Sequence, residues 1–134
     1  MRHGGRILVC EDNVSMADLL CEFLRDCGLE PVGPLGDVES ARHFARVRPL
    51  DGAILDISLN GQPCFPLCAI LSARHIPFVF LTGYGDNSRS LIPMEYRRAP
   101  TLSKPFEPDE MKETLAQMLG LGESMLPANS RLQH

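Results

Sequence analysis

Short apolar runs alternate along this chain with longer segments of helical periodicity. The apolar runs predict five strands, at residues 6–10, 31–35, 52–55, 76–81 and 101–103. The segments between them predict helices, at residues 13–27, 38–47, 65–73 and 108–119. The run at residues 76–81 is almost wholly apolar, which is typical of a parallel strand covered on both faces.

The first predicted helix shows the helical pattern most clearly. Its apolar residues recur at spacings of three and four, and we expect them to face the core: Met16, Leu19, Leu20, Phe23, Leu24 and Cys27. Asn13 is a suitable N-cap for this helix and Gly28 a suitable end. Asp37 precedes the second helix in the same way, and Pro49 stops it.

The alternation of strands and helices predicts an α/β fold with a doubly wound, five-stranded parallel sheet and right-handed crossovers. Five successive βα units are typical of flavodoxin-like folds, in which ligands bind beyond the carboxyl ends of the strands. We expect one domain over residues 1–120 and a flexible C-terminal tail over residues 121–134.

The segment that should form the fourth helix departs from the pattern. Residues 85–100 begin with Gly85, Asp86 and Asn87 and contain Pro93. A proline inside a helix costs about 3 kcal/mol. We predict a short or disordered fourth helix, which is either an order–disorder switch or an irregular surface loop.

Composition narrows the classes of function. The formal net charge is −4, and the only adjacent basic residues of note are Arg97 and Arg98, so we expect no nucleic-acid partner. No apolar run approaches the roughly 18 residues of a membrane span, and no signal peptide is recognisable. We therefore expect a cytoplasmic protein without a membrane partner.

The five cysteines are odd in number and form no CxxC pair. This spacing does not suit zinc. Because most of them fall on apolar faces, we expect small buried thiols rather than redox centres.

Chemically active side chains follow the strands where they end. The first strand precedes Glu11 and Asp12, and the third precedes Asp56. The fourth strand is followed by Thr82 and Gly83, and the fifth by Lys104. The carboxyl ends of parallel strands meet at one edge of the sheet, so we expect these groups to converge there.

Three carboxylates at one sheet edge repel one another, and a hard divalent cation relieves that repulsion. Mg²⁺, or Mn²⁺, prefers such oxygen ligands. A lysine, a hydroxyl and a glycine N–H suit the oxygens of a phosphoryl group. Each of these residues alone has an ordinary structural explanation, but their joint placement indicates a phosphoryl-transfer site.

The motifs ILVCEDN, AILDISLNG, FVFLTGYG and LSKPF together resemble the receiver family of response regulators, from Ile7 to Leu119. The resemblance implies that Asp56 is the phosphoacceptor, supplied by a phosphohistidine on a partner protein. It implies that Glu11 and Asp12 are the acidic pair that holds the metal, with Asp12 the direct ligand. The Ser58 carbonyl matches the third protein ligand.

The same resemblance assigns the remaining residues. Thr82 matches the switch hydroxyl and Lys104 the phosphate-binding lysine, while Gly83 and Ser58 lie beside the phosphoryl group. The Lys104–Pro105 bond is cis in the family, and proline makes that form accessible.

Residues 77–84, PFVFLTGY, resemble more narrowly the stand-alone alphaproteobacterial receivers with a PFxFATGY motif, although Leu81 stands where that motif has alanine. Several such receivers act in phosphorelays of the general stress response. That pathway comes to this chain by analogy alone.

One departure concerns the switch. Many receivers carry an aromatic residue three positions before the lysine, where this chain has Thr101. The usual coupling of hydroxyl and aromatic residue is therefore incomplete. Tyr84 is either a substitute for the missing aromatic or an ordinary surface tyrosine.

These observations predict a single-domain response regulator in a two-component phosphorelay. It would be phosphorylated by a sensor histidine kinase or a histidine phosphotransfer protein, and would signal through an unknown downstream protein or by phosphotransfer. We expect no enzyme activity beyond its own phosphorylation and dephosphorylation.

The alternatives are an unphosphorylated pseudo-receiver and an aspartyl-phosphate phosphatase, which would need an acid where Ser58 stands. A flavodoxin fits less well, because no phosphate loop follows the first strand.

Overall fold

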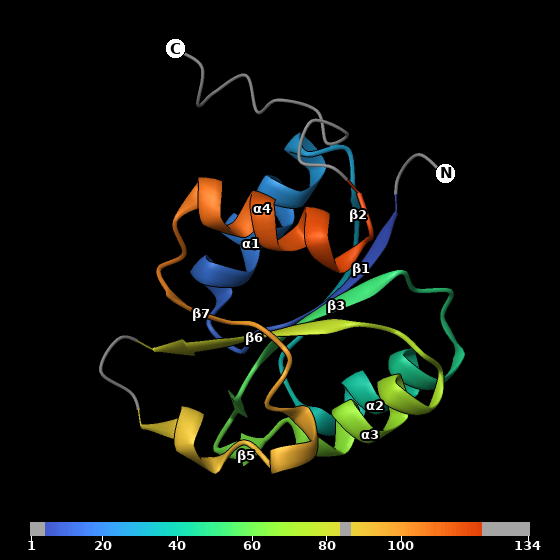
Figure 1. Cartoon of the computed structure of the whole chain (residues 1–134), viewed down its shortest axis with the longest axis vertical. Coiled ribbons are helices and arrows are strands. Elements are labelled where there is room, and N and C mark those ends of the chain that lie inside the picture. The colour runs from blue at the N-terminus through green and yellow to red at the C-terminus, as the bar shows by residue number, and fades with distance from the viewer. Residues whose placement is uncertain (1–4, 84–86, 122–134) are drawn as a thin grey trace.

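A five-stranded parallel sheet forms the centre of the molecule (Figure 1). The computed structural model describes residues 5–83 and 87–121. The strands, in spatial order, are β2 (Glu30–Leu35), β1 (Arg6–Cys10), β3 (Gly52–Asp56), β6 (Phe78–Gly83) and β7 (Thr101–Lys104). The predicted fold class is confirmed.

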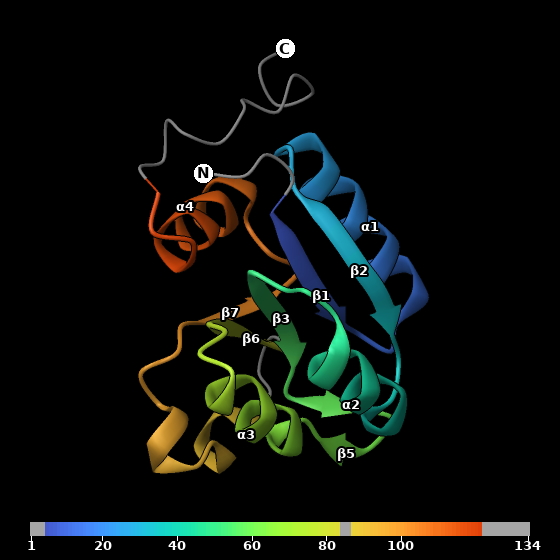
Figure 2. The ribbon, with the colours of Figure 1, turned by 90° about the vertical axis from the view of Figure 1, so that its right-hand side faces the viewer.

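Helices cover both faces of the sheet (Figures 1 and 2). One face packs against α1 (Val14–Asp26) and α4 (Pro108–Met118), and the other against α2 (Val38–Val47) and α3 (Phe65–Ala73). Alternate strand residues supply the two cores. In β3, for example, Ile54 lies in the α1/α4 core and Leu55 in the α2/α3 core. This arrangement leaves the carboxyl ends of the strands free to carry the site.

The predicted helix caps are present. The Asn13 side chain accepts a hydrogen bond from the Met16 N–H at 2.8 Å, and Asp37 accepts one from the Ser40 N–H at 2.8 Å. Gly28, at φ +79°, follows the C-cap of α1. These caps fix where α1 and α2 begin, directly after the strand-end loops.

One predicted core position is wrong. Leu19 is 49% exposed, whereas Ala17 and Cys21 are buried. At 3.6 residues per turn, Leu19 lies on the side of α1 opposite Ala17 and Leu24. Its neighbour Leu20 is the residue that faces the sheet.

The residues that follow β3 form a small hairpin. Its strands are β4 (Ser58–Leu59) and β5 (Gln62–Pro63), which pair antiparallel across a turn at Asn60 and Gly61. Both turn residues have positive φ, +50° and +79°. An Asn-Gly pair with this geometry favours a tight hairpin.

No α-helix lies between β6 and β7 in the described residues. Two single 3-10 turns take its place, η1 (Ser88–Leu91) and η2 (Met94–Tyr96), with Pro93 between them. The sequence predicted a short or disordered fourth helix, and the described part of this segment contains no regular helix. β6 begins two residues later than predicted, after Pro77, and extends through Thr82 and Gly83.

All five cysteines are buried free thiols, as predicted. Among the described residues, no helix is long and apolar enough to cross a membrane. Tyr84 and residues 122–134 of the predicted tail lie outside the described residues.

Candidate metal and phosphoryl site

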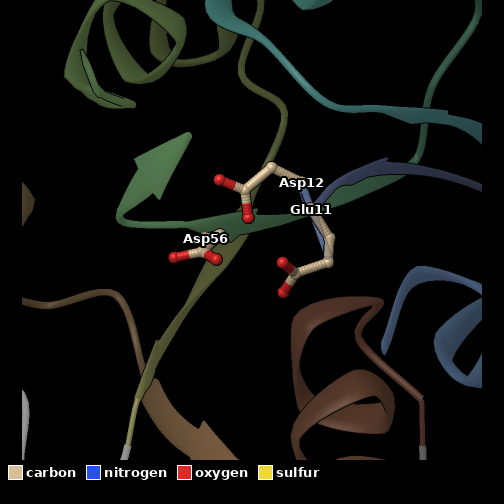
Figure 3. Close-up of side chains that lie close together, drawn as sticks. All are labelled: Glu11, Asp12 and Asp56. Atoms are coloured by element: carbon tan, nitrogen blue, oxygen red, sulfur yellow. The ribbon is translucent and has the colours of Figure 1, made fainter. Parts of the chain in front are cut away.

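Three carboxylates meet at the carboxyl edge of the sheet (Figure 3). Glu11 and Asp12 directly follow β1, and Asp56 ends the neighbouring strand β3. One oxygen from each lies within 4.8 Å of the others. The structure thus brings together the three acids that the sequence predicted.

Lys104, at the end of β7, reaches across β6 to two of these acids. Its Nζ lies 2.7 Å from Asp56 Oδ2 and 3.2 Å from Glu11 Oε1. The following peptide bond, Lys104–Pro105, is cis, as the resemblance implied. The lysine side chain is 20% exposed, so its charge is only partly screened by water.

Glu11 is the most deeply buried of the acids, at 2% exposure. Burial raises its pKa to about 7, and the charge of Asp56 adds to that rise. The Asn13 N–H, which donates to Oε2 at 2.9 Å, and Lys104 act in the opposite direction. Burial lowers the pKa of Lys104, but its contacts with Asp56 and Glu11 outweigh this and leave that pKa raised. The crowded carboxylates therefore favour a bound proton or cation in the cluster.

Both oxygens of Asp56 are held by donors. The Ser58 N–H donates to Oδ1 at 3.1 Å, and Lys104 donates to Oδ2. The Asp56 side chain is 7% exposed. Its carboxylate thus has a fixed orientation at the edge of the sheet.

Asp12 is exposed, in contrast to Glu11 and Asp56. Its Oδ2 accepts a hydrogen bond of 2.7 Å from the Asn60 N–H at the tip of the β4–β5 hairpin. An exposed carboxylate beside two buried ones suits the acid that contacts an incoming cation.

The donor set fits Mg²⁺ or Mn²⁺. Every side-chain group in the cluster offers carboxylate oxygen, which both ions prefer, and the oxygens are close enough for one cation to lie between them. Asp12, Asp56 and the carbonyl of Ser58 would hold the ion, and Glu11 would add negative charge beside it.

Thr82 lies one position beyond the β6 residue that pairs with Asp56, Leu81. It is 4% exposed, and its Oγ1 lies 3.0 Å from the Oγ of Ser88, at the start of η1. Gly83 pairs with Lys104 across β6 and β7. The predicted hydroxyl and glycine thus lie on the strand between the acceptor and the lysine.

Thr101 lies away from the acids, at the start of β7 and paired with Phe80. It lines a pocket of about 530 Å³ together with Arg89, Ser90, Ile92 and Arg97. The other switch candidate, Tyr84, lies outside the described residues.

Two contacts of the site were not predicted. Asn60 contacts Asp12, and Ser88 contacts Thr82. The Asn-Gly pair at residues 60–61 is a hairpin signal that could have placed Asn60 at a turn. No sequence signal pairs Ser88 with Thr82.

Comparison with known proteins identifies the family. Residues 7–116 match the model of the response regulator receiver domain. The chain belongs to this family.

Among solved structures, this receiver is similar to SdrG from Sphingomonas melonis Fr1, a stand-alone alphaproteobacterial receiver. The TM-score is 0.76 at 36% identity, over 89% of this chain and 99% of SdrG. The predicted resemblance to stand-alone receivers of this group is confirmed.

The fold also matches the receiver domain of the sensor histidine kinase PA1611 from Pseudomonas aeruginosa PAO1. The TM-score is 0.70 at 23% identity, over 87% of this chain and 98% of that one. That structure has a magnesium ion coordinated in its active-site cleft. At this identity the match establishes the fold alone.

Among curated proteins, the DNA-binding response regulator MtrA from Mycobacterium tuberculosis H37Rv is 32% identical over 107 residues. The match covers 79% of this chain and 46% of MtrA. The chain therefore spans about half the length of the curated relatives that it matches.

Proposed function

We propose that this receiver is a single-domain response regulator whose Asp56 accepts a phosphoryl group from a phosphohistidine. Receiver domains are phosphorylated by histidine kinases. The observation that carries the proposal is the position of Asp56 between two further acids and Lys104, with 2.7 Å between Lys104 Nζ and Asp56 Oδ2. A carboxylate held by donors and flanked by a cation-binding group suits phosphoryl transfer.

In the proposed reaction, a carboxylate oxygen of Asp56 attacks the phosphorus in line. An O–P bond forms, the P–N bond to the donor histidine breaks, and the imidazole nitrogen retains the electron pair. Bound Mg²⁺ would supply charge neutralisation to the phosphoryl oxygens. Lys104 would shift from the free carboxylate to the phosphoryl group, and the N–H of Gly83 would donate to the same group.

The proposed output begins at Thr82. Its hydroxyl would turn to the phosphoryl oxygens, whose charge of roughly −2 makes them a stronger acceptor than Ser88. Loss of the Thr82–Ser88 hydrogen bond would free η1, whose residues line the pocket beside Thr101. Phosphorylation would thereby change a surface that a partner contacts.

We propose a cytoplasmic location and a receiver domain over residues 1–120. The partners would be a sensor histidine kinase or a histidine phosphotransfer protein, followed by a downstream protein. A role in the general stress response rests on the resemblance to PFxFATGY receivers alone. The DNA-binding activity named for MtrA belongs to that longer protein.

A phosphotransfer profile against the purified histidine kinases and phosphotransfer proteins of the host tests the proposal. We expect rapid transfer from one or a few donors, and transfer in both directions for a shuttle. Mg²⁺ titration followed by NMR distinguishes the proposed function from the pseudo-receiver alternative, which predicts no shift of the Asp12 and Asp56 signals. Absence of both transfer and Mg²⁺-dependent shifts would reject the proposal.

A further inference from the structure

Asn60 joins the acidic site to two other parts of the sheet edge. Its N–H donates to Asp12 Oδ2 at 2.7 Å, and its side-chain Nδ2 donates to the carbonyl of Gly36 at 3.1 Å. Asp12 follows β1, and Gly36 follows β2. Asn60 itself belongs to the hairpin that follows β3. A single residue therefore links the loops after three adjacent strands.

The hairpin that carries Asn60 is anchored at its base. Leu59 is fully buried in the α2/α3 core, and the Cys64 N–H donates to the Ile57 carbonyl at 2.8 Å. Ser58 pairs with Pro63, and Leu59 pairs with Gln62. The tip of the hairpin is thus held beside the site by the buried packing of Leu59 and by the two hydrogen bonds of Asn60, to Asp12 and Gly36.

The receiving loops are also fixed relative to one another. The Glu11 N–H donates to the Leu35 carbonyl at 3.0 Å. A Cβ added at Gly36 would lie 3.7 Å from the Cα of Asp12, so the two backbones are in close contact. The Gly36 carbonyl accepts a hydrogen bond from the Asn60 side-chain amide. The hairpin tip therefore cannot move away from the loops after β1 and β2 without breaking this bond.

Asp12 depends on this contact more than the other acids do. Glu11 and Asp56 are buried and are held by Lys104, whereas Asp12 is exposed. An exposed carboxylate samples several rotamers, and a cation that binds it must select one of them. The Asn60 N–H restricts the orientation of the Asp12 carboxylate before any cation arrives.

We propose that Asn60 is a positioning residue whose side-chain bond to Gly36 fixes the hairpin tip, so that its N–H holds Asp12 in the orientation required to bind a divalent cation. The inference rests on the proposed function, because it assumes that the acids bind such an ion. Asparagine suits both demands at this position. It tolerates the left-handed φ of +50°, and its amide reaches Gly36. Loss of a hydrogen bond to a metal-binding side chain changes metal affinity about 10- to 100-fold in well-formed sites. Because Asp12 is exposed, we expect an effect at or below the low end of that range.

The test is a titration with Mn²⁺, followed by water-proton relaxation, on the full chain. Asn60→Gly keeps the left-handed turn and the N–H but removes the link to Gly36. We expect it to weaken Mn²⁺ binding about 3- to 10-fold, and Asn60→Ala at least as much, because alanine also strains the turn. Gln62→Ala, on the same exposed hairpin, should bind like the unmodified protein. Asp12→Asn should lose most of the binding.

Thermal unfolding without metal separates positioning from folding. The inference predicts weaker Mn²⁺ binding by Asn60→Gly at a temperature where that variant is fully folded. A second measurement needs no Asn60 variant. The amide proton of Asn60 should shift upfield in Asp12→Ala, which removes its acceptor.

The outcomes distinguish the two levels of the account. The inference would be overturned if Asn60→Gly bound Mn²⁺ as tightly as the unmodified protein. It would also be overturned if the amide proton of Asn60 kept its chemical shift in Asp12→Ala. Either result would leave the proposed function intact. Absence of Mn²⁺ binding by the unmodified protein would overturn both.

Discussion

Lys104 is the only basic side chain that contacts the acidic cluster in the described residues, and it touches both buried acids. Removal of this charge leaves Asp56 without the donor at 2.7 Å and Glu11 without its cation. Lys104 is also the group best placed to follow charge onto an incoming phosphoryl group. Its role at the site is therefore electrostatic, and a neutral side chain of similar length should not replace it.

We predict that Lys104→Met lowers the rate of phosphorylation by a small phosphodonor roughly 10²-fold, the usual effect of losing one preorganised donor to a developing charge. Lys112→Met is the matched control, because Lys112, on α4, forms no ion pair with the acids in the part of the chain that the structure describes. The rate is measured by intact mass at several donor concentrations. An unchanged rate in Lys104→Met would contradict the assigned role.

At the residue scale, much of the site was predictable from the sequence. The side chains that meet at the site each lie at the end of a strand: Glu11, Asp12, Asp56 and Lys104. The order of the parallel strands determines which strand ends are neighbours. The contacts of Asn60 and Ser88 depend instead on the exact path of two loops. Strand order does not determine those paths.

At the element scale, the segment from β6 to β7 differs from a regular βα unit. Proline at residue 93 separates two 3-10 turns, and the first begins at Ser88, the partner of Thr82. Pro93 made the absence of a regular helix predictable. The 3-10 geometry was not predictable, because it depends on local hydrogen bonds such as that from the Ile92 N–H to the Arg89 carbonyl.

We predict that Ser88→Ala loosens η1 without preventing phosphorylation of Asp56. The lost hydrogen bond to Thr82 should speed amide exchange over residues 88–92 about 5- to 10-fold, as expected for a bond worth about 1 kcal/mol. Hydrogen exchange followed by mass spectrometry measures the change.

Ser90→Ala is the control for this prediction. Ser90 Oγ donates to the Asn87 carbonyl at 2.8 Å within the same segment, and among the described residues no hydrogen bond joins it to Thr82. The unmodified protein should reach the fast exchange of Ser88→Ala when phosphorylated, and Ser90→Ala should still respond to phosphorylation. A phosphorylated protein whose exchange over residues 88–92 stays slow would contradict the proposed switch.

The error at Leu19 and the unpredicted hairpin have the same kind of cause. Periodicity alone placed Leu19 inward, yet the sheet contacts only the stripe that contains Ala17, Leu20 and Leu24. The hairpin at residues 58–63 likewise gave no strand signal, because two-residue strands are too short to show alternation. Both features depend on how neighbouring elements pack.

At the scale of the whole molecule, the acidic site couples cation binding to stability. The folded chain brings Asp56 beside Glu11 and Asp12, from which it is distant in the unfolded chain. A cation that binds only the folded form stabilises it by mass action. The strand order therefore creates the site and also a repulsion between carboxylates, which lowers the stability of the folded chain until a cation binds.

We predict that Mg²⁺ at ten times its dissociation constant raises the free energy of unfolding by about 1.4 kcal/mol. The value is measured by urea unfolding with and without Mg²⁺, at constant ionic strength. Asp12→Asn should lose most of this gain, while Asp51→Asn, at the opposite end of β3 from the cluster, should retain it. An equal gain in Asp12→Asn would place the cation elsewhere.

The most direct test of the central claim is the mass of the intact protein after incubation with Mg²⁺ and a small-molecule phosphodonor. The account predicts that the unmodified chain gains one phosphoryl group and that Asp56→Asn gains none. Asp51→Asn, at the opposite end of β3, should be labelled like the unmodified chain. Full labelling of Asp56→Asn would contradict the assignment of Asp56 as the phosphoacceptor.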